Sequence, residues 1–222
     1  FENAYEELVV QKNIRSYFRE SRVIYSNMDY NLRLLCDGGR NYSTEDDGSE
    51  YIDYPALKEL QREPWYQKLG ENSSSIKYIP AYVSRELRKT EDDSAMRAVR
   101  LIKNLNSGRV LGIMEVNITQ KQVEGIFRGG VEKESQQVFL MDSTGKILCS
   151  TEGSLVQQSV EDREYLKKLT GFDHGYFSAK MSGRPAQVSF VTNGTTGWKL
   201  VMYEEEKGAV WTANRIFVMI LL

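Results

Sequence analysis

Between residues 76 and 118 the chain alternates apolar and polar positions in a way that predicts β-strands. The predicted strands are IKYIPAYVS, AMRAVRLIKNL and RVLGIMEVNI, and the polar stretches RKTEDDS and NSG separate them. Thr119 and Gln122 have the spacing of a helix capping box, so we expect a helix as soon as the last strand ends. The pair Gly129 and Gly130 should end this helix.

A second set of segments follows in a similar order. The strands QVFLMD and ILCST flank the turn STGK, a helix is predicted near VEDREYLKKL, and the strands GYFSAK, AQVSFVT and WKLVMYEE follow it. The last strand again runs into a helical segment, EEKGAVWTANRIF. This parallel predicts an α+β fold made of two related antiparallel units in tandem, with their boundary near Gly130.

The region before these strands is predicted to be helical at both ends. Residues 1–20 have apolar side chains at mostly helical spacing, with charges between them and no Gly or Pro, which indicates an amphipathic helix. Residues 37–53 are rich in Gly, Ser, Asp and Glu and are typical of a loop. Helical spacing resumes over residues 54–70, where Pro64 interrupts it just before an aromatic pair.

The chain ends in an apolar run that contrasts with its polar composition. Mean hydropathy is -0.49 and 27% of the residues are charged, yet the seven residues 216–222 are all apolar. A complete membrane helix needs roughly 20 such residues. Trp211 and Arg215 precede the run, and both are residue types found at membrane interfaces. We expect a helix over residues 206–222 that leads into a truncated transmembrane segment; the alternative is a terminal helix packed on the domain.

Composition excludes several classes of function. The 222 residues, 41% of them hydrophobic, can form one large or two small globular domains. The net charge of -2 and the scattered Lys and Arg residues provide no basic surface for nucleic acid. The two cysteines, Cys36 and Cys149, fall in different expected units, so we expect free thiols.

Few residues in the chain suit catalysis. His174 is the one histidine, which excludes a histidine-rich metal site, and neither a phosphate-binding Walker loop nor a dinucleotide GxGxxG motif occurs. The acidic stretch STEDDGSE lacks the ligand spacing of an EF-hand calcium loop. We therefore expect no catalytic residues, no metal and no cofactor in this chain.

Glu115 is chemically unusual for its predicted position. It lies on a strand that is apolar on both faces, so its carboxylate needs a partner, and Arg100 on the preceding strand is the candidate. Two interpretations stay open: a cross-strand ion pair that faces solvent, or a polar group directed into a ligand cavity with aromatic walls. In the second interpretation the ligand-binding residues are Trp65, Tyr66, Tyr78, Arg100, Glu115 and Asn117.

The chain resembles the extracellular double Cache sensor region of bacterial YesM-type histidine kinases. The resemblance covers nearly the whole chain and rests on the order and spacing of the segments RVIYSN, PWYQKLG, IKYIPAYVS, VRLIKNLNSGRVLGIMEVNI, VFLMDSTGKILCS and TGWKLVMYEEE. It implies a long N-terminal helix, two PAS-like units with the ligand usually in the membrane-distal one, and a dimeric kinase core beyond a second membrane span. The implied domains are a signalling helix (1–21), a membrane-distal unit (22–130), a membrane-proximal unit (131–205) and a terminal helix (206–222).

The resemblance also implies roles for individual residues. Trp65 and Tyr66 stand where the family has its helix aromatics, Tyr78 where it often has an aromatic strand residue, and Arg100 at its strand arginine.

Two positions depart from the pattern of amino-acid-binding relatives. Glu63 stands where they carry Arg, with Arg62 one position out of register, and Asn117 replaces the acid expected to meet an amine. We therefore do not expect an amino acid as ligand.

The expected function is that of an extracellular sensor in a bacterial cell membrane. It would bind a small molecule or a partner binding protein and relay a conformational change through its terminal helices to a histidine kinase outside this chain. The flanking helices would attach it to the membrane, and the full receptor would be a homodimer. A Cache ectodomain of a chemotaxis receptor is one alternative; a cell-surface hydrolase or a carbohydrate-binding module is an alternative of another class.

Overall fold

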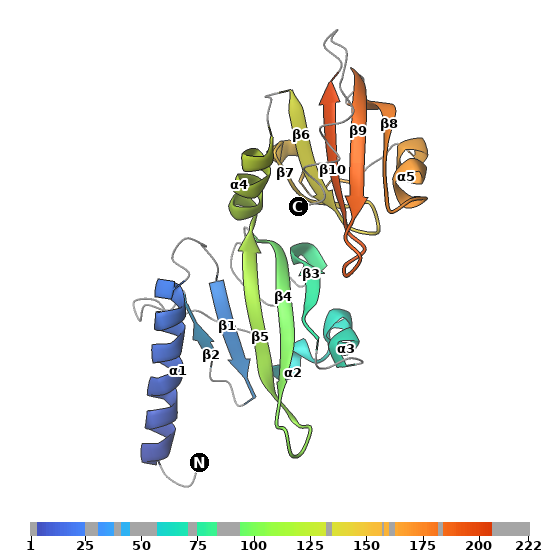
Figure 1. Cartoon of the computed structure of the whole chain (residues 1–222). Coiled ribbons are helices and arrows are strands. Elements are labelled where there is room, and N and C mark those ends of the chain that lie inside the picture. Colours follow the sequence, from blue (N-terminus) through green and yellow to red (C-terminus); the bar gives the residue numbers. More distant parts are fainter. Residues whose placement is uncertain are drawn as a thin grey trace. The chain divides into compact units, whose positions relative to one another are not determined.

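The chain folds into two compact units, each built on a five-stranded antiparallel sheet (Figure 1). The computed structural model describes residues 4–24, 31–37, 41–44, 57–70, 75–83, 94–131, 135–156, 158–159, 163–181 and 184–205. The first unit is Phe1–Thr119 and the second is Gln120–Leu222. The predicted α+β fold with two antiparallel sheets is confirmed.

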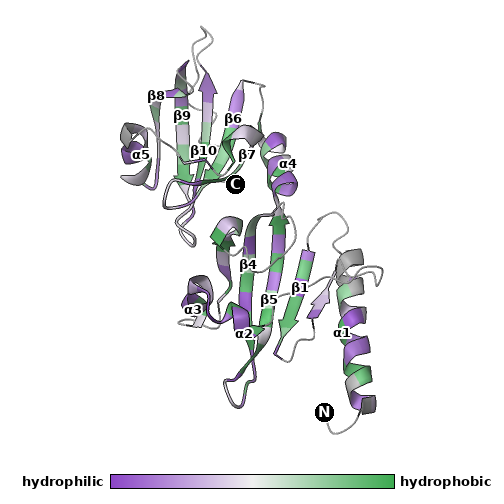
Figure 2. Cartoon of the chain, turned by 180° about the vertical axis from the view of Figure 1, so that it is seen from behind, coloured by the Kyte–Doolittle hydropathy of each residue, from purple (hydrophilic) through white to green (hydrophobic). Residues whose placement is uncertain are grey.

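The first unit begins with the helix α1 (Ala4–Ile24), along which hydrophilic and hydrophobic turns alternate (Figure 2). Its remaining elements are β1 (Asn31–Cys36), β2 (Asn41–Ser43), α2 (Leu57–Leu60), α3 (Pro64–Gly70), β3 (Lys77–Pro80), the 3-10 helix η1 (Ala81–Val83), β4 (Ser94–Lys103) and β5 (Val110–Thr119). The strand order in this sheet, which we call sheet A, is β2-β1-β5-β4-β3. Phe18 of α1 packs near Tyr42 of β2, with 6.4 Å between the ring centroids.

The second unit repeats the topology of the first. Its elements are α4 (Gln120–Gly130), β6 (Gln136–Met141), β7 (Ile147–Ser150), the 3-10 helix η3 (Gly153–Leu155), α5 (Arg163–Thr170), β8 (His174–Met181), β9 (Arg184–Thr192) and β10 (Lys199–Glu205). The order in sheet B is β7-β6-β10-β9-β8, which is the order of sheet A with five added to each strand number. The prediction of two related units in tandem is therefore supported by the connectivity of every strand.

The same turn closes the hairpin β4–β5 and the hairpin β9–β10. In each turn an Asn side chain accepts hydrogen bonds from two backbone N–H groups, and a Gly donates its N–H to the carbonyl of that Asn. The pairs are Asn104 with Gly108 and Asn193 with Gly197. Their glycines have φ of 69° and 71°, a left-handed conformation that a residue with a Cβ adopts only at a cost. The spacing N-x-x-x-G is thus a repeated structural feature.

Two local predictions about helices are confirmed and one about a loop is wrong. The helix over residues 54–70 is broken at Pro64, which begins α3 because a proline fits the first helical position. The helix α4 runs from Gln120 to Gly130, as its capping residues and glycine pair predicted, and lies in the second unit. Within residues 37–53, however, Asn41–Ser43 forms the edge strand β2, because β1 supplies its hydrogen-bonding partners.

The predicted terminal helix and transmembrane segment, residues 206–222, lie outside the described residues. Among the helices that the structure does describe, none has the length and hydrophobicity needed to cross a membrane.

Candidate functional site

One face of sheet A carries charged side chains that are fully removed from solvent. Arg33, Arg97 and Glu115 each have 0% exposed surface. Glu115 lies between the two arginines: its Oε1 is 3.1 Å from Arg97 Nε and its Oε2 is 3.5 Å from Arg33 Nη1. Buried charges are costly unless they are paired, and the two ion pairs provide Glu115 with such partners.

The register of sheet A brings these side chains together. Arg33 of β1 and Val99 of β4 are the partners of Glu115 on either side of β5. One pleat further along, Arg97 is the partner of Asn117. Because side chains directly opposite one another point to the same face of a sheet, the four polar residues form two adjacent rows on the buried face.

A hydrogen bond fixes Arg97 from outside the sheet. Its Nη1 donates to the carbonyl oxygen of Ala81 at 2.9 Å, in the 3-10 helix that follows β3. Arg97 therefore links Glu115 to η1, and its guanidinium has a defined orientation.

Asn117 differs from the arginines because its amide is not satisfied. The residue is fully buried, and neither its Oδ1 nor its Nδ2 forms a hydrogen bond with any residue that the structure describes. The same holds for Nε1 of Trp65 and the hydroxyl of Tyr66, both in α3 and both buried. A buried polar group without a partner costs about 1–3 kcal/mol, and proteins retain few of them. Asn117 lies on β5 and the other two residues on α3, and at each of these atoms a bound molecule or water would supply the missing partner.

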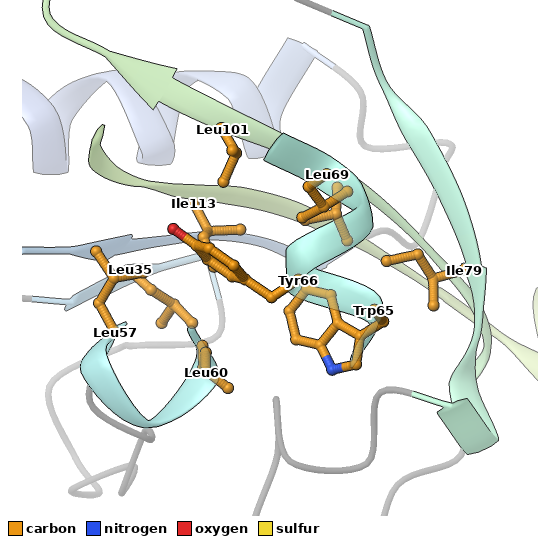
Figure 3. Packing of buried hydrophobic residues seen from close by; sticks show 10 residues of the cluster. Leu35, Leu57, Leu60, Trp65, Tyr66, Leu69, Ile79, Leu101 and Ile113 are labelled. Carbon is orange, nitrogen blue, oxygen red and sulfur yellow. The ribbon is translucent and has the colours of Figure 1, made fainter. Parts of the chain in front are cut away.

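Apolar residues cover the remaining part of this face. In Figure 3, Tyr66 lies across Leu35 and Ile113, and Trp65 lies on the side of Ile79. The rings of Trp65 and Tyr66 meet edge to face, with centroids 6.0 Å apart. The whole apolar cluster consists of Leu35, Leu57, Leu60, Trp65, Tyr66, Leu69, Ile79, Val99, Leu101 and Ile113.

The apolar and polar rows meet beneath α3. Ile79 is the partner of Arg97 in the pairing of β3 with β4, and Ile79 and Trp65 belong to the same apolar cluster. The row that lies two rows away from Arg97 and Asn117 is entirely apolar and consists of Leu35, Ile113 and Leu101. A molecule held here would meet charged and amide groups on one side and hydrocarbon on the other.

The structure divides the predicted ligand-binding residues between the two faces of sheet A. Glu115 and Asn117 lie on the buried face, and Trp65 and Tyr66 of α3 are buried in the apolar cluster that packs with this sheet. Tyr78 is 43% exposed and its partner is Ala98, so it lies on the opposite face.

Arg100 is also exposed on that opposite face, and the predicted ion pair between Arg100 and Glu115 is wrong. Arg100 lies opposite Met114, one residue away from the position that faces Glu115. Because successive side chains on a strand alternate between faces, Arg97 can reach Glu115 and Arg100 cannot. The interpretation of a solvent-facing pair is excluded as well, since Glu115 is fully buried.

Two residues of the buried cluster were missed by the sequence prediction. Arg97 lies on a predicted strand, three residues before Arg100, and only the face assignment separates the two. Arg33 lies in NLRLLC, a segment for which no strand was predicted. An arginine flanked by leucines was the available signal for a strand with one buried face.

The second unit also has a buried cation, Lys199, whose contacts differ from those of the arginines in sheet A. The ammonium group of Lys199 donates to the carbonyl of Phe172 at 2.8 Å and to the hydroxyl of Thr192. It also lies 5.3 Å from the centre of the Phe190 ring. Burial lowers the pKa of Lys199, and the Asp173 carboxylate opposes that shift. Its contacts make Lys199 a structural residue of sheet B.

Solved structures share this fold at low sequence identity. The extracellular domain of a histidine kinase, rpHK1S-Z16, aligns with a TM-score of 0.62 at 16% identity over 90% of this chain and 88% of its own. The ligand-binding domain of the Campylobacter jejuni chemoreceptor Tlp3, in complex with 4-methylisoleucine, aligns with a TM-score of 0.59 at 16% identity over 91% of this chain and 75% of its own. The ligand-binding domain of the Pseudomonas fluorescens chemoreceptor CtaA, in complex with L-isoleucine, aligns with a TM-score of 0.55 at 16% identity over 79% of this chain and 68% of its own.

No protein-family model and no curated protein matches the chain. The structural likeness confirms the two-unit fold that the resemblance to double Cache regions implied.

Proposed function

We propose that this chain is the extracellular ligand-sensing region of a transmembrane sensor histidine kinase and has no catalytic activity of its own. The observation that carries the proposal is the buried face of sheet A, where Asn117, Trp65 and Tyr66 keep polar atoms without partners among the described residues. A protein would retain such costly groups where a ligand satisfies them. The shared fold with extracellular ligand-binding domains supports this proposal.

The strand that carries the site also leads to the second unit. Glu115 and Asn117 lie on β5, and α4 begins at Gln120 immediately after the strand ends. A ligand can shift a receptor between two states only if it binds them with different affinity. A ligand on β5 would shift the receptor by favouring one arrangement of this strand and of α4, the helix that continues it.

The N-terminal helix is our proposed contact between two copies in the full receptor. Tyr5 and Leu8 are 75% and 63% exposed, one helical turn apart on α1. Disulfide cross-linking of cysteines placed along α1 in the membrane-embedded receptor should favour this side of the helix; equal cross-linking of all sides would contradict the contact.

A chemoreceptor ectodomain is the second candidate, because ligand-binding domains of chemoreceptors share the fold. In the whole receptor, a kinase output predicts ligand-dependent autophosphorylation of the same chain. A chemoreceptor output predicts ligand-dependent activity of a separate kinase.

Ligand binding can be tested on the 222-residue chain by a thermal-melt screen of sugars, organic acids, amines and peptides. A ligand at about 100 times its Kd should raise the free energy of unfolding by about 2.7 kcal/mol. Asn117→Leu should remove this stabilisation, while the unliganded variant is as stable as wild type or more so, because an unsatisfied buried amide has been replaced by hydrocarbon.

Arg100→Ala, on the exposed face of the same sheet, is the matched control and should keep the full ligand response. The proposal fails if no compound raises the melting temperature of the wild-type chain. It also fails if the response persists unchanged in Asn117→Leu.

A further inference from the structure

We infer that Gln120 ties the end of β5 to β7 of the second unit, and that a change in β5 reaches the last described strand, β10, through this contact. The inference rests on the proposed function, because it names how a change at the candidate site would leave the first unit. β5 ends at Thr119 and α4 begins at Gln120, so no loop separates the strand from the helix. Because consecutive Cα atoms are fixed at about 3.8 Å, a displacement of the end of β5 moves the first turn of α4.

The side chain of Gln120 binds β7 at an irregular point of that strand. Its Nε2 donates to the carbonyl oxygen of Leu148 at 2.6 Å. In the pairing of β6 with β7 the register shifts here: Ile147 and Cys149 have partners on β6, and Leu148 between them has none. An extra residue in one strand interrupts the ladder and lacks a residue opposite it. Gln120 therefore binds β7 at the residue that β6 skips.

A second contact holds the far end of α4 to the same part of the sheet. Nη2 of Arg128 donates to the carbonyl oxygen of Thr151, the residue after β7, at 3.4 Å, and it also lies 2.6 Å from a carboxylate oxygen of Glu124 one turn earlier. Val123, between the two contacts, is 6% exposed, and α4 lies beside β7 in Figure 1. The residues Gln120 and Arg128 are about 12 Å apart along the helix axis. Because α4 is held near both ends, it should move together with β7.

The residues that follow β7 connect it to β10. Oε2 of Glu152 accepts from the hydroxyl of Tyr203 at 3.2 Å, and Tyr203 lies on β10 with 3% of its surface exposed. Burial raises the pKa of Tyr203 and the Glu152 carboxylate raises it further, so the hydroxyl keeps its proton and stays a donor. Oγ1 of Thr151 donates to Oε1 of Gln137 on β6 at 2.7 Å, which ties the strand between β7 and β10 to the same segment. A displacement of β7 would thereby reach the strand that ends at Glu205.

Methyl NMR of the 222-residue chain, labelled at methionine, tests the inference without a ligand. Met114 lies on β5 and Met202 on β10, so their methyl groups report on the two ends of the proposed path. Asn117→Leu is the perturbation on β5, and in the wild-type background it should shift the resonances of both methionines. In combination with Gln120→Leu it should shift Met114 as before, and the shift of Met202 should be smaller by about twofold or more.

The matched control is Lys121→Leu, because Lys121 is exposed at the next position of the same helix. It should leave the response of Met202 at its wild-type size. Gln120→Lys restores a donor on a side chain of similar length and should recover most of the response. A general loosening of the helix would lower the response in the control as well, and the lysine would not repair it.

The inference is wrong if Asn117→Leu leaves the Met202 resonance in place, or if Gln120→Leu does not reduce its shift. Val116→Ala on β5 and Gln120→Ala repeat the comparison if either first variant fails to fold, and the same two outcomes then decide it. Neither outcome depends on a bound compound. The proposed ligand-sensing function fails separately, when no compound raises the melting temperature of the wild-type chain.

Discussion

Replacing Glu115 by Gln should destabilise the first unit far more than the loss of an ordinary ion pair. The substitution keeps the shape of the side chain and removes its charge, so two fully buried guanidinium groups face a neutral amide. Removing one partner from a buried ion pair costs about 3–5 kcal/mol, because the remaining charge stays desolvated without compensation. We expect Glu115→Gln to lower the free energy of unfolding by about this amount.

The matched control is a pair in the same sheet that reaches solvent. Asp37 follows β1, and its Oδ2 accepts from Nη2 of Arg109 at 2.6 Å, just before the start of β5; the Arg109 side chain is 70% exposed. Exposed pairs contribute at most about 1 kcal/mol. Asp37→Asn should therefore have a small effect although its pair is shorter than either contact of Glu115.

Urea denaturation followed by tryptophan fluorescence measures both effects. Trp65 belongs to the first unit, so a background with Trp198→Phe and Trp211→Phe makes the signal report on that unit alone. A loss of less than 1 kcal/mol for Glu115→Gln, or a loss no larger than for Asp37→Asn, would refute the reasoning that this carboxylate neutralises a buried positive cluster.

A combined variant separates charge from packing. Replacing Glu115 by Leu together with Arg33 and Arg97 by Met removes all three charges and keeps apolar volume. Most of the lost stability should return, since apolar residues of similar size can replace a buried ion pair without cost. No recovery would show that the shape of these side chains, and not their charge, supports the sheet.

The remaining predictions concern two close-packed positions. Gly112→Ala should lower the free energy of unfolding by about 1–3 kcal/mol, since a Cβ would lie 2.5 Å from the carbonyl oxygen of Leu35. Gly70→Ala is the control, because no atom lies within 4 Å of its Cβ position, and it should change the free energy of unfolding by less than about 0.5 kcal/mol in the same urea assay. Burial raises the pKa of Cys149 from 9.0 to about 12. The free energy of unfolding should therefore fall by up to about 1.4 kcal/mol per pH unit above pH 9, and Cys149→Ala should lack this component; equal pH slopes would contradict it.

Local rules were sufficient for the elements of the second half of the chain. Alternation, a capping box and paired glycines predicted the strands after residue 94 and the helix α4, because each of these signals acts over a few residues. The tandem arrangement could also be predicted, although only the spacing N-x-x-x-G connects the two hairpin turns in detail. The first edge of sheet A was missed, since β2 has three residues in a polar segment and the leucines of β1 do not alternate strictly with polar residues.

The composition of the site was predicted only in part. Trp65, Tyr66, Glu115 and Asn117 could be singled out because aromatic, acidic and amide side chains are unusual at their predicted positions. Whether they bind a ligand remains a prediction. Arg33 could not be associated with them, because 82 positions in the numbering separate it from Glu115 and only the pairing of β1 with β5 brings the two together.

The sequence by itself determined the class of fold and the two-unit organisation, and it showed that a charged residue occupies an unusual position on an apolar strand. Only the tertiary structure decided which arginines neutralise Glu115. Arg100 was the partner predicted from the sequence, but the strand pairing places Arg97 on the buried face and Arg100 in solvent. The physical reason is that a shift of one residue in register exchanges the two faces of a strand, and register depends on contacts between segments that are distant in the chain.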